Sequence, residues 1–221
     1  MNMEERKLKN AMRFYILATR LKYKIRSGWN ETHWDIKKER LESIAEHVYG
    51  ACILAISIYS EFEYDVDLNK VLKMLVIHEL GECIIGDITP FDHVSKEEKL
   101  EIEHKAFKEV VGDLGLKEEL NSLIFEFDER KTNEAIFAYY CDKLEADIQA
   151  KVYQDMGCQK SLENQENNVV FQNNHVKQMI ENGAKTAFDI WFEWDKNIYS
   201  KDETFSKLLD YVKEHDTQKL E

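Results

Sequence analysis

Histidine and carboxylate side chains that could bind a metal ion fall on otherwise apolar helical faces of this sequence. His47 lies three, four and seven residues from apolar side chains, and His78 shares a stripe with aliphatic ones. Glu79 lies about 100° around the same predicted helix, and Asp142 lies on a face of small residues. An inward charge without a partner is very unfavourable, so such acids pair with cations or bind metal. Together these side chains predict one shared divalent ion, and their ligand chemistry suits Mn²⁺, Co²⁺, Fe²⁺ or Zn²⁺ better than Mg²⁺.

A structural interpretation competes with the metal hypothesis. A His followed by an acid occurs easily by chance, and this chain has two such pairs, at 78–79 and 215–216. A single inward His is more often a hydrogen-bonded core residue, and a single buried Asp more often pairs with Arg or Lys. The ordered combination favours metal binding: an inward His, a His-acid doublet about thirty residues later and an inward Asp about sixty beyond that.

Helices must position these groups, because one proline and eight glycines leave few chain breakers. Ser43 with Glu46 forms a capping-box pattern, and Asp67 is a further N-cap candidate. The segment 86–90 ends the third helix, 26–30 is a loop, and no strand pattern is convincing. We predict helices over about 4–24, 43–60, 68–85, from 95, then 117–128, 132–153, 175–194 and 202–214.

The chain is predicted to be one all-α domain over residues 1–221. Its length and 43% hydrophobic content suffice for a substantial core. We place the core at about 10–155, a polar Asn/Gln-rich loop at about 156–174, and a C-terminal helical extension at about 175–221. The extension is too short for an independent core. We expect its aromatic residues, Trp191 and Trp194, to pack on the core or on a second subunit, and the charged run 95–108 to form a solvated helix face.

The net charge of −13 argues against nucleic-acid and anionic-membrane partners. Any phosphate substrate must then be small or meet a local positive group such as a metal, although an acidic surface can also serve solubility alone. We find no signal peptide and no apolar run of about 18 residues. The four cysteines form no C-x-x-C pair. A reducing cytoplasm is therefore the expected location.

Three segments resemble the HD-domain 5′-deoxynucleotidases, bacterial enzymes acting on deoxynucleoside monophosphates and their eukaryotic HD-domain relatives. They are SIAEH at 43–47, HELGECIIGDITP at 78–90 and YYCDKLE at 139–145. The resemblance runs from about Phe14 to Tyr153, includes the acidic pair at 128–129 and leaves 156–221 unmatched. Its most specific part is the Gly-Asp-Ile-Thr-Pro ending. The resemblance implies an HD-domain helical bundle with a metal site between helices, and it suggests a homodimer.

The resemblance also implies roles for individual residues. The implied metal ligands are His47, His78, Glu79 and Asp142. Glu82 would be the general acid or base, and Asp87 would lie near the attacking water and the sugar. Arg26 and Trp29 would hold phosphate and nucleoside, although Trp29 can equally be a loop anchor. Thr89 and Pro90 would shape the pocket wall, although Pro90 can be a plain helix stop.

The implied function is that of a hydrolase: a 5′-nucleotidase that releases phosphate from (deoxy)nucleoside 5′-monophosphates by attack of metal-activated water, with one divalent transition metal per chain. Two alternatives stay open. One is an HD phosphohydrolase acting on a nucleoside triphosphate, pyrophosphate or cyclic nucleotide. The other is a decayed nucleotide-binding or interaction module, because the family has Asp where this chain has Glu79. The extra methylene moves the carboxylate outward by roughly 1.5 Å, whereas metal–ligand distances tolerate about 0.2 Å.

Overall fold

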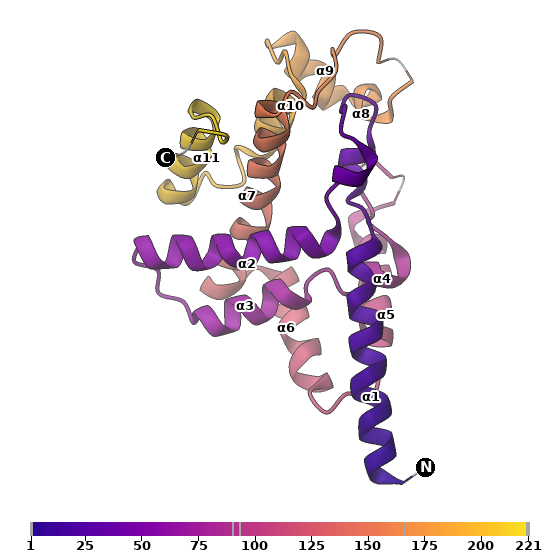
Figure 1. Cartoon of the computed structure of the whole chain (residues 1–221). Helices are drawn as coiled ribbons and strands as arrows, with labels where there is room; N and C mark the ends of the chain where they lie inside the picture. The colour runs from indigo at the N-terminus through magenta and orange to yellow at the C-terminus, as the bar shows by residue number, and fades with distance from the viewer. Residues whose placement is uncertain (1, 90, 93, 166, 220–221) are drawn as a thin grey trace. The chain divides into compact units, whose positions relative to one another are not determined.

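The computed structural model describes residues 2–89, 91–92, 94–165 and 167–219. Over these residues the chain is helical, with only two isolated β-bridges besides the helices (Figure 1), which confirms the all-α prediction. The chain divides into a first unit, Met1–Arg26 with Glu42–Cys141, and a second unit, Ser27–Leu41 with Asp142–Glu221. The prediction of a single domain stays a prediction. None of the described helices has the length and apolar character needed to cross a membrane.

Local capping signals begin three helices of the first unit where the sequence predicts them. Ser43 and Ser95 each form a complete capping box, and the Asp67 carboxylate accepts from the backbone at the start of its helix. The helices are α1 Met3–Ala18, η1 Thr19–Tyr23, α2 Ile44–Glu61, α3 Leu68–Ile77, α4 Glu82–Ile85, α5 Lys96–Val111 and α6 Lys117–Glu129. A longer helix, α7 Asn133–Asp155, begins in this unit and continues into the second.

Two of the predicted helices in the first unit differ from those observed. The helix predicted over 4–24 is α-helical only to Ala18 and continues as the 3₁₀ turn η1. The helix predicted over 68–85 is wrong, because α3 ends at Ile77 and a turn leads into the short α4. Gly81 explains this break: a Cβ there would lie 2.9 Å from the Glu103 backbone oxygen, so the turn brings the chain unusually close to α5. Gly86 then ends α4 with a φ of 81°, which glycine adopts at little cost.

The core of the first unit lies between α2, α3, α5 and α6. Its fully buried side chains include Ile44, Val71, Met74, Leu75 and Phe107. The run 95–108 is therefore not only a solvated face, because α5 buries Ala106 and Phe107. The α1 helix is fastened to the end of α5, since the Arg13 guanidinium donates to the carbonyl oxygens of Glu109 (2.8 Å) and Val110 (3.1 Å).

The second unit contains shorter helices than the sequence predicts. The predicted loop 156–174 includes a short helix, and the helix predicted over 175–194 is two helices separated at Gly183, whose φ is 111°. Thr186 caps the second of them with Asp189. The elements are η2 Ser27–Asn30, η3 Lys38–Arg40, the rest of α7, α8 Val169–Gln172, α9 Asn174–Glu181, α10 Ala187–Asp195 and α11 Glu203–Glu214.

An aromatic cluster forms the centre of the second unit. Trp29 is 1% exposed and stacks on Trp191, with ring centroids 4.3 Å apart. Trp34 and Tyr153 pack edge-on against Trp29 at 5.4 and 5.3 Å. The burial of Trp29 agrees with the alternative that this side chain anchors its loop. Its predicted contact with substrate stays a prediction.

Candidate metal and catalytic site

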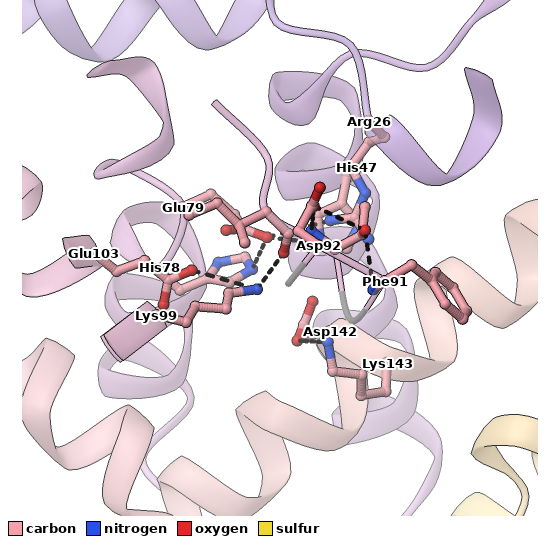
Figure 2. Close-up of polar contacts among 12 residues, drawn as sticks. Arg26, His47, His78, Glu79, Phe91, Asp92, Lys99, Glu103, Asp142 and Lys143 are labelled. Atoms are coloured by element: carbon pink, nitrogen blue, oxygen red, sulfur yellow. Dashed lines mark hydrogen bonds and ion pairs between the residues drawn. The ribbon is translucent and has the colours of Figure 1, made fainter. Parts of the chain in front are cut away.

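Three of the predicted metal ligands converge in the first unit. His47 comes from the first turns of α2, while His78 and Glu79 follow the end of α3. The Glu79 Oε1 atom lies 3.4 Å from His78 Nε2 and 3.9 Å from His47 Nε2, and the two rings are 5.6 Å apart (Figure 2). His47 is fully buried, as its apolar stripe predicts, and the His78 ring is 4% exposed.

The hydrogen bonding of His78 leaves its Nε2 lone pair directed at this cluster. Its Nδ1 atom lies 2.7 Å from the Leu75 carbonyl oxygen. A carbonyl can only accept, so Nδ1 carries the hydrogen and a neutral ring keeps its lone pair on Nε2. Metal-binding histidines in proteins are commonly held in one tautomer by such a bond. The backbone of α3 thus holds His78 in the tautomer that metal binding through Nε2 requires.

The donor set fits a divalent cation. One ligand atom of each of His47, His78 and Glu79 lies within 4.8 Å of the others. Two atoms that bind one ion at about 2.1 Å lie about 3 to 3.5 Å apart, close to the His78–Glu79 separation. Two imidazoles and a carboxylate suit a borderline transition metal. The extra methylene of Glu79 therefore does not keep its carboxylate away from the two histidines.

Arg26 contacts the same Glu79 oxygen. Its Nη1 atom lies 3.2 Å from Oε1, and both side chains are 15% exposed (Figure 2). The backbone holds Arg26 in place, because its amide donates to the Glu42 carbonyl oxygen at 3.0 Å and Ile25 bridges to Ser43. A guanidinium beside the candidate ligands provides the planar fork that phosphate oxygens accept.

Glu82 is a buried acid at the start of α4. It is 4% exposed, and its Oε2 atom meets no hydrogen-bond partner within the described part of the chain. Burial, and then the negative charges of Glu79 and Asp87, raise the pKa of Glu82 well above its usual range, against the opposing charges of Arg26 and Lys99. Such a carboxyl group keeps its proton at a higher pH than an exposed acid and can deliver it to a leaving group.

The segment after α4 carries the other predicted substrate contacts. Asp87 is half-buried, and its charge acts on Glu82. Thr89 donates its backbone N–H (2.7 Å) and its hydroxyl (2.9 Å) to Asp92 Oδ2, which makes a tight turn. Pro90 lies outside the described residues. The Thr89 hydroxyl proton is thus already engaged within its own loop.

Asp142 and Trp29 belong to the second unit. Asp142 begins the second segment of that unit, follows Cys141 directly on α7 and is buried. Its Oδ2 atom forms an ion pair with Lys143 Nζ at 3.0 Å (Figure 2). Trp29 lies within the aromatic cluster described above.

Lys99 is a cation that the sequence reasoning missed. Its Nζ atom donates to the Ile88 carbonyl oxygen at 2.5 Å and lies 3.4 Å from Glu103 Oε1 (Figure 2). It therefore fastens α5 to the segment after α4, and its charge reaches Glu82. The only signal in the sequence was the i,i+4 spacing to Glu103, which also describes an ordinary exposed helix face.

Asp128 on α6 belongs to the acidic pair of the resemblance, but the sequence reasoning missed its partner, His104 on α5. His104 Nε2 and Asp128 Oδ2 lie 2.6 Å apart, and both side chains are about one-fifth exposed. Burial raises the pKa of Asp128, with the charge and hydrogen bond of His104 acting in the opposite direction. The ring of His78 packs 5.2 Å from that of Phe127, the residue before Asp128. Asp128 therefore directly follows, in the sequence, a residue whose ring packs against the candidate ligand His78.

The family model and the curated relatives that match this chain point to the same family. The HD-domain family model matches residues 18–186. The chain is 35% identical over 151 residues to 5′-deoxynucleotidase HDDC2 of Danio rerio, which covers 66% of this chain and 71% of that protein. It is 32% identical over 154 residues to 5′-deoxynucleotidase HDDC2 of Dictyostelium discoideum, which covers 66% and 79%.

Solved structures share the fold. A predicted metal-dependent phosphohydrolase from Magnetospirillum magnetotacticum MS-1 aligns with a TM-score of 0.65 over 98% of this chain and 96% of that one, at 20% identity. A conserved hypothetical protein from Pyrococcus furiosus aligns with a TM-score of 0.58 over 91% and 98%, at 25% identity. The chain therefore belongs to the HD-domain family, with 5′-deoxynucleotidases among its similar relatives.

Proposed function

We propose that this protein is a metal-dependent phosphohydrolase that releases phosphate from deoxynucleoside 5′-monophosphates. The observation that carries the proposal is the convergence of two imidazole Nε2 atoms and the Glu79 carboxylate beside the Arg26 guanidinium. The similarity to relatives named 5′-deoxynucleotidases supports the substrate class. Arg26 also supplies a local positive charge, which an anionic phosphate ester needs because the net charge of −13 repels it from the protein.

The metal would be held by His47, His78 and Glu79, with Asp142 as the fourth ligand. The resemblance of the segment 139–145 to the HD-domain 5′-deoxynucleotidases supports this role for Asp142, and its side chain is buried. A divalent ion supplies Lewis-acid charge to phosphoryl oxygens and lowers the pKa of water. Mn²⁺, Co²⁺, Fe²⁺ and Zn²⁺ all suit these ligands.

The protein's own side chains divide the remaining work. Arg26 orients the phosphate through its guanidinium N–H groups. Glu82 holds a proton in a buried position and donates it to the departing sugar oxygen. Asp87, on the segment after α4, orients the sugar side of the substrate. Lys99 keeps that segment attached to α5 through the Ile88 carbonyl oxygen.

Replacing Glu82 with Gln tests the assignment. The amide cannot supply the proton, so we expect kcat for deoxynucleoside monophosphates to fall about 10²- to 10⁴-fold. The bound metal, measured by mass spectrometry, should equal that of the wild type. Glu101→Gln makes the same substitution at an exposed position on α5 and should leave kcat unchanged. Unchanged turnover in Glu82→Gln contradicts the role of Glu82.

A substrate panel tests the reaction itself. Deoxynucleoside and ribonucleoside monophosphates, triphosphates and cyclic nucleotides are compared with separate detection of phosphate and pyrophosphate. Phosphate release from monophosphates, at the highest kcat/KM for the deoxy forms, is the expected result. Release from triphosphates alone assigns a different nucleotide substrate. Bound metal with no turnover of any of these substrates, or no bound metal at all, overturns the proposal.

A further inference from the structure

A cavity lies in the first unit beside the short helix α4. Its volume is about 600 Å³, within the range typical of small-molecule sites. It is formed by α1, η1, α4 and α5, and its lining residues are Arg13, Ile16, Leu17, Arg20, Lys24, Cys83, Ile84 and Glu109. None of these side chains belongs to the metal and catalytic site.

The cavity is positively charged on an acidic protein. Three of its lining residues are cations and one is an acid, whereas the whole chain has 30 Lys and Arg against 43 Asp and Glu. Neither Arg20 nor Lys24 forms an ion pair within the described residues, so their charges are available to a ligand. Burial raises the pKa of the Cys83 thiol at the cavity floor, and the charges of Arg20 and Lys24 act against that rise.

One wall of the cavity is fixed before any ligand binds. Arg13 already donates to the carbonyl oxygens of Glu109 and Val110, which fastens α1 to the end of α5. Its guanidinium adds charge without being free to move. Arg20 lies on η1, and Lys24 is the C-cap of η1, so both cations lie at the same end of this wall. A ligand therefore meets a preformed surface, which reduces the ordering cost of binding.

The rest of the lining is apolar. Ile16 is 53% exposed, and Leu17 and Ile84 are half-buried, so hydrocarbon surface is open beside the two cations. A hydrated inorganic ion would leave this surface unused. We propose that the cavity binds a small organic anion, whose acidic group lies between Arg20 and Lys24 and whose apolar body covers Ile16, Leu17 and Ile84. This inference does not rest on the proposed phosphohydrolase activity.

Fluorescence titration with 8-anilinonaphthalene-1-sulfonate tests the site, because this probe combines one sulfonate with an apolar ring system. The full chain is compared with the double variant Arg20→Gln/Lys24→Gln. We expect the dissociation constant to rise about tenfold or more in that variant, because it loses two charge-assisted contacts. Circular dichroism and thermal unfolding establish that each variant is folded.

A matched control separates the cavity from general charge. Arg6→Gln/Lys7→Gln makes the same charge change at exposed positions of α1 outside the cavity. Its dissociation constant should equal that of the wild type. Equal weakening in both double variants means that binding follows the overall charge, which overturns the proposal.

Ile16→Asn tests the apolar half of the site at a position that is 53% exposed. We expect weaker binding of the probe with both cations still present. Saturable binding that is unchanged in Arg20→Gln/Lys24→Gln and in Ile16→Asn places the probe elsewhere and overturns the proposal. Absence of any probe binding by the wild type also overturns it.

Discussion

Replacing Asp195 with Asn is expected to stabilise the protein at neutral pH. In the second unit, the fully buried Asp147 accepts a 2.6 Å hydrogen bond from the Tyr199 hydroxyl at Oδ2, whereas its Oδ1 atom meets no hydrogen-bond partner among the described residues. Burial raises the pKa of Asp195 from 3.8 to about 6, although the charge of Lys143 opposes the rise. Burial and the charge of Asp195 raise the pKa of Asp147 as well. The two carboxyls therefore hold a proton that the unfolded chain releases at lower pH.

The sign and size of the effect follow from linkage. The folded pKa of Asp195 lies above the unfolded value, so stability is lost as the pH rises from about 3.8 to about 6, and the loss is complete above that window. At 1.36 kcal/mol for each pH unit between the two values, the full loss is about 3 kcal/mol. Asn cannot ionise, so the variant does not have this pH-dependent loss. The variant should therefore gain up to about 3 kcal/mol at pH 7.5 but only about 1 kcal/mol at pH 4.5.

Urea titrations followed by circular dichroism at the two pH values, with a chelator present, measure this difference. Asp210→Asn is the matched control, because it removes the same charge from an exposed position on α11. Its free energy of unfolding should change equally at both pH values. A gain in Asp195→Asn that does not depend on pH, or a loss of stability at pH 7.5, refutes the shared-proton reasoning.

Three further predictions concern the first unit. Gly81→Ala places a Cβ 2.9 Å from the Glu103 backbone oxygen and should lower the free energy of unfolding by about 1–3 kcal/mol, measured by thermal unfolding. Gly115→Ala is the control, because a Cβ there meets nothing within 4 Å and should leave stability unchanged. Equal losses in the two variants would argue against the close approach at Gly81. Arg26→Ala should raise the KM for a monophosphate about tenfold or more, because a charged contact to phosphate is lost, and an unchanged KM would exclude that contact. A chelator should abolish phosphate release and lower the Tm, because a metal that binds only the folded chain stabilises that chain. Added Mn²⁺ should restore both the activity and the Tm. A Tm that does not change on chelation would contradict metal binding.

Local signals in the sequence predicted much of the fold. Ser43, Asp67 and Ser95 begin their helices as predicted, because an N-cap depends only on the next three residues. The break between α3 and α4 was not predicted, since its cause is the contact of Gly81 with Glu103 on another helix. Gly183, whose φ is 111°, divides a helix that periodicity alone extends from 175 to 194.

The candidate site was predictable as a set of residues but not as a geometry. The apolar stripe of His47 placed it inward, and it is fully buried. The contact of Arg26 with Glu79 joins residues 53 positions apart, and no periodicity shows such a pair. Lys99 was missed for the same reason, because its partner at Ile88 is a backbone carbonyl in a turn. Helical spacing predicts the face of the helix on which a side chain lies, whereas its contacts depend on tertiary packing.

The distribution of tryptophan gives the chain a built-in optical reporter. The first unit contains no tryptophan, and the second unit contains all four of the chain: Trp29, Trp34, Trp191 and Trp194. Selectively excited tryptophan emission therefore follows the second unit alone, whereas ellipticity follows the helices of both. Coincident emission and ellipticity curves in urea would make the 221 residues one cooperative folding unit, and separated curves would make them two.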